Sequence, residues 1–405
     1  MQTSVRGVVS TLALLALAAV VGCKTQPPIS TPGIHEVEQD WQNKSQPTPD
    51  TYPIPEQTIT RALADTFGSD AGLLPAQPVP AGKPLDILLL SGGGKFGAFS
   101  TGFLAGWTAT GKRPNFDVVT GVSTGAIIAP LVFLGPQYDE ALKNYFITMK
   151  REDLFNIHPI RGIRRHDSLA DPNPLKAIID WQVTDQFVAD IKCEHLRGRR
   201  LFVGTTNLMT HRLTVWDLGA IAASGRPDST DLVRKVILAA CSIPGFLPPV
   251  EFDVTVNGVC YHELHGDAGN VAQSFIRTAN GLPPGSNVYA LSAGYLYSPP
   301  RTERPGFLGL ATRGISDSLD ALFRADLLNI NTLCAVSHAR FNLIDMPTTI
   351  KSTGGSMAFD PAESKVMYDT GYQMGLNGPK WRHSPPGTYP GEGAIPRTGL
   401  DFVTK

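Results

Sequence analysis

A serine between two glycines lies at the junction of an apolar segment and a stretch of small and aliphatic residues. Residues 121–125 have the G-x-S-x-G pattern, with Ser123 flanked by Gly121 and Gly125. The apolar residues 116–119 predict a buried strand, and a helix is expected directly after the pattern. On a sharp strand-to-helix turn the serine hydroxyl projects at the helix N-terminus, where the helix dipole favours negative charge. The pattern therefore predicts an α/β arrangement and makes Ser123 a candidate nucleophile. The alternative is a small-residue turn with a capping serine.

A second strand-to-helix junction lies upstream. Residues 85–90 form a nearly continuous apolar run, typical of a parallel strand covered on both faces. Gly92, Gly93 and Gly94 follow, before a helix expected over residues 98–110. Consecutive glycines here leave backbone N–H groups open at the positive end of a helix dipole, which suits an anion. The anion is either a nucleotide phosphate or an acyl-transfer oxyanion. The spacing lacks the phosphate-loop pattern, and a serine on the next strand favours the oxyanion.

A carboxylate that can serve as a base occurs later in the chain. Residues 254–261 predict a β-hairpin around an Asn-Gly turn. Asp267 follows among small residues, with Ala268 and Gly269 directly after it. Asp267 is a candidate base for Ser123. The alternative is a turn aspartate that bonds its own backbone.

Together these three sites resemble those of the patatin-like phospholipase family. The resemblance covers about residues 85–294 and includes the stretch 239–250 before the hairpin. It implies an α/β fold, a three-layer α/β/α patatin-like sandwich with a mainly parallel central sheet. It also implies a serine lipid acyl hydrolase of phospholipase, lysophospholipase or carboxylesterase type. In that family Ser123 corresponds to the nucleophile and Asp267 to the base of a Ser–Asp dyad, and the loop Gly92 to Gly94 forms the oxyanion hole.

Two residues depart from the family pattern. The basic residue of the oxyanion loop usually stands directly before the last glycine, whereas Lys95 comes one place earlier and Phe96 takes that place. We therefore expect the Lys95 side chain to point elsewhere. Ala268 stands where the dyad motif usually has glycine, and it would be strained if that position required a positive φ. Neither change removes a chemically required group.

Two alternative functions stay open. An α/β-hydrolase triad runs from Ser through Asp or Glu to His, and His338 and His383 lie downstream of Asp267. A dyad is nevertheless sufficient. Aspartate, with an ordinary pKa of about 3.9, can take the serine proton where water is excluded and oxyanion donors stabilise the developing charge. The second alternative is a non-catalytic lipid- or protein-binding envelope lipoprotein on the same fold.

The N-terminus has the pattern of a lipoprotein signal. An apolar run over residues 8–21, too short for a stable membrane span, precedes Cys23. Residues 20–23 resemble a bacterial lipobox, which implies that Cys23 is lipidated and becomes the mature N-terminus. The alternative is an ordinary secretory signal. Several acyl chains on one cysteine would anchor the protein to the bacterial envelope. Lys24 after the cysteine favours the outer membrane, facing the periplasm.

These patterns divide the chain into four parts. Residues 1–22 are the expected signal peptide, and residues 23–83 are a Pro-rich tether and connector, expected to be extended and mobile. Residues 84–345 are the expected catalytic domain, and residues 346–405 a C-terminal helix and irregular tail. Roughly 320–350 residues beyond the tether suffice for one large domain. Their alternating strand and helix patterns are typical of a layered α/β fold.

Periodicity predicts the remaining elements. Helices are expected over residues 59–67, 138–149, 173–182, 232–240, 319–330 and 360–375. Strands are expected over residues 201–205, 213–216 and 288–291.

Charge and residue types exclude several functions. The net charge is −1 without a long basic run, so nucleic acid is not an expected partner. The cysteines form no C-x-x-C pair, which argues against a zinc or redox site. His262, His265 and Asp267 resemble a metal-ligand set, but alternation along a strand gives them poor geometry. The expected partners are a lipid or ester substrate and, through Cys23, the membrane. No metal or other cofactor is expected.

Overall fold

The computed structural model describes residues 82–157, 168–277, 281–298 and 306–387. The expected signal peptide with Cys23 and the tether with its helix over residues 59–67 lie outside the described residues.

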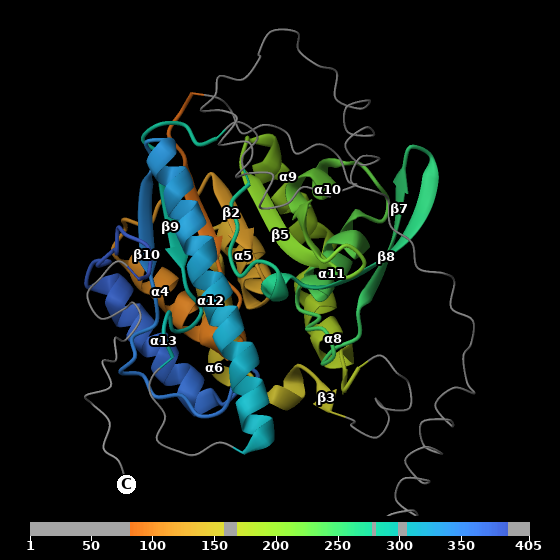
Figure 1. The fold of residues 1–405 in the computed structure, drawn as a ribbon. Helices are drawn as coiled ribbons and strands as arrows, with labels where there is room; N and C mark the ends of the chain where they lie inside the picture. The colour runs from red at the N-terminus through yellow and green to blue at the C-terminus, as the bar shows by residue number, and fades with distance from the viewer. Residues whose placement is uncertain (1–81, 158–167, 278–280, 299–305, 388–405) are drawn as a thin grey trace, which may run out of the picture.

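A mixed β-sheet forms the centre of the protein (Figure 1). Across the sheet the strands follow the order β10 (Arg340–Ile344), β9 (Asn287–Leu291), β1 (Asp86–Leu90), β2 (Val118–Gly121), β5 (Arg200–Asn207), β8 (Val259–Asp267) and β7 (Val250–Val256). A further strand, β6 (Arg212–Asp217), pairs with β5. The five strands from β10 to β5 are parallel to one another, whereas β5–β6, β5–β8 and β7–β8 are antiparallel pairs. A short separate pair joins β3 (Asn156–Ile157) to β4 (Ala170–Asp171).

Helices cover both faces of this sheet. The helices of the described residues are α4 (Gly97–Ala109), α5 (Thr124–Leu134), α6 (Asp139–Thr148), α8 (Asn173–Gln182), α9 (Asp185–Leu196), α10 (Leu218–Ala223), α11 (Ser229–Ala240), α12 (Phe307–Val336) and α13 (Pro361–Leu376). Short 3₁₀ turns include η1 (Gly94–Phe96), η2 (Pro136–Tyr138), η3 (Arg151–Asp153) and η4 (Ala268–Asn270).

Alternate residues of the central strands pack into two separate hydrophobic cores. Ile87 and Leu89 of β1 pack with α12, while Leu88 and Leu90 pack with α4, α5 and α13 on the other face. In Figure 1, α12 crosses the near face of the sheet and α4 and α5 lie behind it. The expected three-layer α/β/α sandwich with a mainly parallel central sheet is confirmed.

Most expected elements are present, and their ends shift by a few residues. β2 begins two residues later than expected, and α5 starts directly after the serine. The hairpin turns at Asn257 and Gly258, which both have positive φ as a type I′ turn requires. α12 is much longer than the expected helix over residues 319–330. Its early turns carry the exposed residues Leu310 and Ile315, so they lack the one-sided apolar pattern that the prediction used.

None of the helices in the described ranges has both the length and the apolar character needed to cross a membrane.

Glycines bring α4 and α13 into backbone contact. A Cβ added to Gly102 or Gly106 of α4 would lie 2.1 or 2.0 Å from a backbone oxygen of α13. Added to Gly371 or Gly375 of α13, it would lie 2.2 or 2.3 Å from a backbone oxygen of α4. Each helix thus uses two glycines, four residues apart, to approach its partner more closely than side chains allow. The C-terminal helix is therefore part of the main core.

The substitution Gly371→Ala tests this crossing. We expect it to lower the free energy of unfolding by about 1–3 kcal/mol, because the added methyl group would overlap the carbonyl oxygen of Phe99. The matched control is Gly314→Ala in α12, where a Cβ meets nothing within 4 Å. This control should raise the free energy of unfolding by about 0.5–1 kcal/mol, as is usual for alanine in an open helix position. Urea denaturation measures both, and similar effects at the two sites would contradict the close crossing.

Candidate active site

Ser123 stands at the C-terminal edge of the parallel strands, between β2 and α5. Its backbone has φ 53° and ψ −121°, a conformation rare for a residue with a side chain. Both flanking glycines are required by close packing. A Cβ on Gly121 would lie 2.3 Å from the oxygen of Gly125, and one on Gly125 would lie 2.4 Å from the oxygen of Leu90. The G-x-S-x-G segment is thus a strained strand-to-helix turn, as its sequence predicts.

The glycine loop lies on the neighbouring strand, because β1 pairs with β2 and Leu90 is opposite Gly121. A Cβ on Gly92 would lie 3.2 Å from the Cβ of Ser123, so the loop borders the serine directly. No N–H group of Gly92, Gly93 or Gly94 donates a hydrogen bond to another described residue. Free N–H donors beside a serine are the arrangement that an oxyanion hole needs.

The last two loop glycines also have a packing role. A Cβ on Gly93 would lie 1.8 Å from the oxygen of Ala293. Gly94 has φ 55°, and a Cβ on it would lie 2.3 Å from the oxygen of Ser356. A bulky residue at Gly93 would therefore displace the backbone before it obstructed any ligand.

Asp267 reaches the serine through strand pairing. It is the last residue of β8, and it lies opposite Thr205 of β5, which itself pairs with β2. Its side chain is almost fully buried at 4% exposure. Its Oδ1 accepts a hydrogen bond of 2.7 Å from the N–H of Gly269. The fold thus brings together Ser123 and Asp267, which are far apart in sequence.

The Ser123 side chain lies close enough to the Asp267 carboxyl to influence its pKa. Burial raises the pKa of Asp267 to about 6, although Ser123 and the hydrogen bond from the Gly269 N–H lower it. A carboxylate with a raised pKa is a better proton acceptor near neutral pH than an exposed one. Chemically, the pair can transfer a proton from the hydroxyl to the carboxylate beside a loop of free N–H groups.

Residues 88–275 match the family model described as patatin-like phospholipase. The chain contains a patatin-like phospholipase domain. This match runs from β1 to a point shortly after η4, so it includes the glycine loop, Ser123 and Asp267. It supports a lipid acyl hydrolase.

Comparison with curated proteins gives no match. Among solved structures, the crystal structure of VipD from Legionella pneumophila is similar at 13% identity and a TM-score of 0.34, over 79% of this chain and 72% of that chain. Human GIVD cytosolic phospholipase A2 is similar at 11% identity and a TM-score of 0.28. That likeness covers 83% of this chain and 56% of the human one, so the chain spans little more than half of its length.

The turn after α11 contacts the backbones of both Ser123 and Asp267. The sequence analysis did not predict these contacts. The Cys241 thiol donates to the carbonyl oxygen of Ser123 at 3.5 Å. The carbonyl oxygen of Ser242 accepts from the N–H of Asp267 at 2.8 Å. The Thr206 hydroxyl donates to the carbonyl oxygen of Asp267 at 2.9 Å. The first two contacts hold the backbones of Ser123 and Asp267 to the same turn, and the third holds Asp267 to β5.

A second unanticipated support comes from α12. The buried Asp326 carboxylate accepts hydrogen bonds from the N–H groups of Gln273 at 2.7 Å and Ser274 at 3.2 Å. The Gln273 amide then donates to the carbonyl oxygen of Gly269 at 2.9 Å. Its Oε1 would lie 2.9 Å from a Cβ on Gly92. Gln273 therefore packs between the oxyanion loop and the turn after Asp267.

Ala268 fits the dyad turn without strain. It does not have a positive φ, and it is fully buried at the start of η4. Its methyl group lies opposite Gly204 of β5, where an added Cβ would be 3.3 Å away. The glycine usual in the family is thus replaced by alanine where a facing glycine leaves room.

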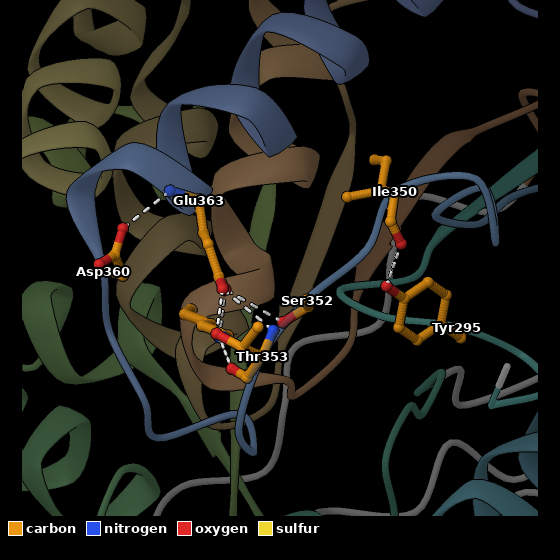
Figure 2. A network of polar contacts seen from close by, with 7 residues as sticks. Tyr295, Ile350, Ser352, Thr353, Asp360 and Glu363 are labelled. Carbon is orange, nitrogen blue, oxygen red and sulfur yellow. Dashed lines mark hydrogen bonds and ion pairs between the residues drawn. The ribbon is translucent and has the colours of Figure 1, made fainter. Parts of the chain in front are cut away.

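Lys95 points away from Ser123, as its displaced position suggests. Its side chain is fully buried, and its ammonium donates to the oxygen of Thr353 and to Oε2 of Glu363, both at 2.7 Å. Figure 2 shows Glu363 at the start of α13 reaching Ser352 and Thr353, while Asp360 caps the Glu363 N–H. Burial raises the pKa of Glu363, but the hydrogen bonds from Lys95 and Thr353 outweigh it and lower the pKa to about 2. Lys95 thus ties the oxyanion loop to the C-terminal helix.

The histidines of the alternative sites have other contacts. His338 lies two residues before β10, an edge strand of the sheet that is three strands away from β2, and His383 Nδ1 contacts the oxygen of Phe341 at 3.0 Å. The buried His265 ring contacts the Thr205 hydroxyl and Glu263, each at 2.9 Å, so both its nitrogens are engaged. The described residues contain no cluster of histidine, cysteine and acidic side chains suited to a metal.

The Lys95–Glu363 pair can be tested with Glu363→Gln. Glutamine retains an acceptor but not the charge, so we expect the free energy of unfolding to fall by roughly 1.5–3 kcal/mol at neutral pH. Because folding lowers the Glu363 pKa, this contribution is present above pH 4.5 and is lost as the pH falls toward 2. The variant should therefore lose less stability than the wild type across that window.

The control for this test is Asp369→Asn on the same helix, which removes an exposed ion pair with Lys365. It should change the free energy of unfolding by no more than about 0.5 kcal/mol. Denaturation at several pH values measures both variants. If both variants lost the same free energy of unfolding, the buried Lys95–Glu363 pair would contribute no more than an exposed ion pair.

Proposed function

We propose that the protein is a serine lipid acyl hydrolase in which Ser123 and Asp267 form a catalytic dyad. The observation that carries the proposal is a serine on a strained strand-to-helix turn that shares its backbone support with the buried Asp267, whose pKa burial raises to about 6. The patatin-like domain supports the substrate class, a lipid ester of phospholipid or lysophospholipid type.

The proposed reaction has two steps. In the first, Ser123 Oγ attacks the ester carbonyl while Asp267 takes its proton, and the N–H groups of Gly92 to Gly94 stabilise the oxyanion. The leaving alcohol receives the proton from Asp267, and an acyl-enzyme remains on Ser123. In the second step, Asp267 accepts a proton from the water that attacks the acyl-enzyme, and it returns this proton to Ser123 Oγ as the ester bond breaks and the fatty acid leaves. This chain's own residues suffice for both steps.

The two alternatives have less support. A triad would need a histidine beside Asp267, but His338 and His383 lie at the far edge of the sheet. In a non-catalytic binding protein nothing would require the strained backbone of Ser123 or the buried carboxylate of Asp267, and both cost stability.

Substitutions of the dyad test the proposal. Purified wild-type protein should hydrolyse p-nitrophenyl butyrate and become labelled by a fluorophosphonate. Ser123→Ala should abolish labelling and lower kcat by roughly 10⁴–10⁶-fold. Asp267→Asn should lower kcat by roughly 10⁴-fold, because an amide takes no proton. Its thermal midpoint should be no lower than that of the wild type, since burial disfavours the charge that it removes.

The same assay has controls and a pH dependence. His383→Ala and His338→Asn, the latter chosen because His338 has positive φ, should retain activity. In the wild type, kcat/KM should fall as the pH drops below about 6, because Asp267 is then protonated. Loss of activity in a folded histidine variant would favour a triad, and absence of both turnover and labelling would favour the non-catalytic alternative.

We further propose that the enzyme is a lipoprotein of the bacterial envelope, anchored through Cys23 to the outer membrane and facing the periplasm. The support is the lipobox-like sequence at residues 20–23 after a short apolar run. The Pro-rich residues 23–83 would then act as a tether that holds the catalytic domain away from the bilayer.

Fractionation tests the anchor. In an expressing bacterium the wild-type protein should sediment with membranes and incorporate labelled palmitate at Cys23. Cys23→Ser should block incorporation, because serine has no thiol to carry the diacylglycerol. Unmodified wild-type protein in the soluble periplasmic fraction would rule out the anchor.

A further inference from the structure

An apolar cavity of about 460 Å³ lies between α5, α6, α8, α11 and the start of α9. Its volume is in the usual range for small-molecule sites in proteins, roughly 300–1,000 Å³. Its walls are mainly aliphatic and aromatic, and none of its lining residues carries a charge. A ligand here therefore has to be uncharged and apolar over most of its length.

The cavity follows the face of α5 that starts at the serine. Ile127, Pro130 and Leu131 line it, and they stand four, seven and eight residues after Ser123. These intervals place all four residues on one helix face. From Ser123 to Leu131 the helix axis advances by about 12 Å. A chain bound along this face would thus begin within one helical turn of the candidate nucleophile.

The other end of the cavity is open to solvent. Trp181 of α8 lines the cavity and is 78% exposed, so it stands at the opening. A tryptophan at the opening of an apolar cavity suits contact with an apolar chain, because most of its ring surface is apolar. No Lys or Arg lines the cavity to pair with a phosphate, so a charged headgroup would remain outside it.

We propose that this cavity binds the acyl chain of the ester substrate, with the chain running along α5 from Ser123 toward Trp181. The identity of the ester rests on the proposed function, whereas the site itself rests on the shape and chemistry of the cavity. The cavity then sets the preferred acyl length, because each methylene group buried in it strengthens binding until the space is filled. Ala141 of α6, which is exposed and lines the cavity, becomes a specificity-determining residue.

The test compares p-nitrophenyl esters of butyrate, octanoate, dodecanoate and hexadecanoate on the full chain. In the wild type, kcat/KM should rise by about fourfold per methylene until it levels off. Ala141→Trp puts an indole into the cavity and should lower the ratio of kcat/KM for dodecanoate to that for butyrate by at least about tenfold, since two or more methylenes lose their site.

The matched control is Ala177→Trp in α8. Ala177 is also exposed on a helix, but it does not line the cavity. This variant should keep the wild-type ratio. The proposal is overturned if Ala141→Trp keeps the wild-type chain-length profile, or if both variants lose the long-chain preference equally.

A binding measurement separates this inference from the proposed function. In full-chain Ser123→Ala, 12-bromododecanoate should quench tryptophan fluorescence, and the quenching should disappear in Ser123→Ala with Trp181→Phe. Adding Ala141→Trp to Ser123→Ala should weaken the binding of dansyl-undecanoate by at least about tenfold. If the wild type hydrolyses no ester but these binding results hold, the proposed function fails and the acyl-chain site stands. Absence of binding by either probe overturns the site.

Discussion

The position of Ser123 near the buried Asp267 carboxyl depends on several parts of the fold that are distant in sequence. Ser123 needs the strained turn after β2, and Asp267 needs the pairing of β8 with β5. The turn at Cys241 joins the two. Burial of the carboxylate disfavours its charge, which is a stability disadvantage, yet the same burial raises its pKa to about 6, as the proposed role of a base requires. The burial that would make Asp267 reactive under the proposed function thus also lowers the stability of the fold.

The sequence predicted the parts of the site whose cause is local. Where the backbone must pass close to another segment, only glycine fits, so the sequence itself marks the position. Gly121 and Gly125 are such positions. The supports of the site depend instead on partners distant in sequence. Glu363 is 268 residues from Lys95, and Asp326 is 53 residues from Gln273. Nothing near either acidic residue in the sequence marks its partner, so only the folded chain identifies it.

Element predictions followed the same division. The strands β1 and β9 carry uninterrupted apolar runs, and both were predicted because burial on two faces leaves a direct record in the sequence. The helix α9 was missed because charged residues interrupt its buried positions, and β10 was missed because Arg340 and Asn342 break its apolar run. The cavity was also missed, since it is formed by side chains of several helices that share no pattern.

The link between the glycine loop and α13 has a consequence for the order in which the candidate site is assembled. A ribosome makes the glycine loop, Ser123 and Asp267 well before it reaches Glu363. A nascent chain of that length contains Ser123 and Asp267, but Lys95 has no Glu363 to pair with and α4 has no helix across its glycines. The loop acquires its native anchor only when the last part of the chain has been made. An incomplete chain that ends before Glu363 would therefore contain Ser123 and Asp267 but leave the glycine loop without its support.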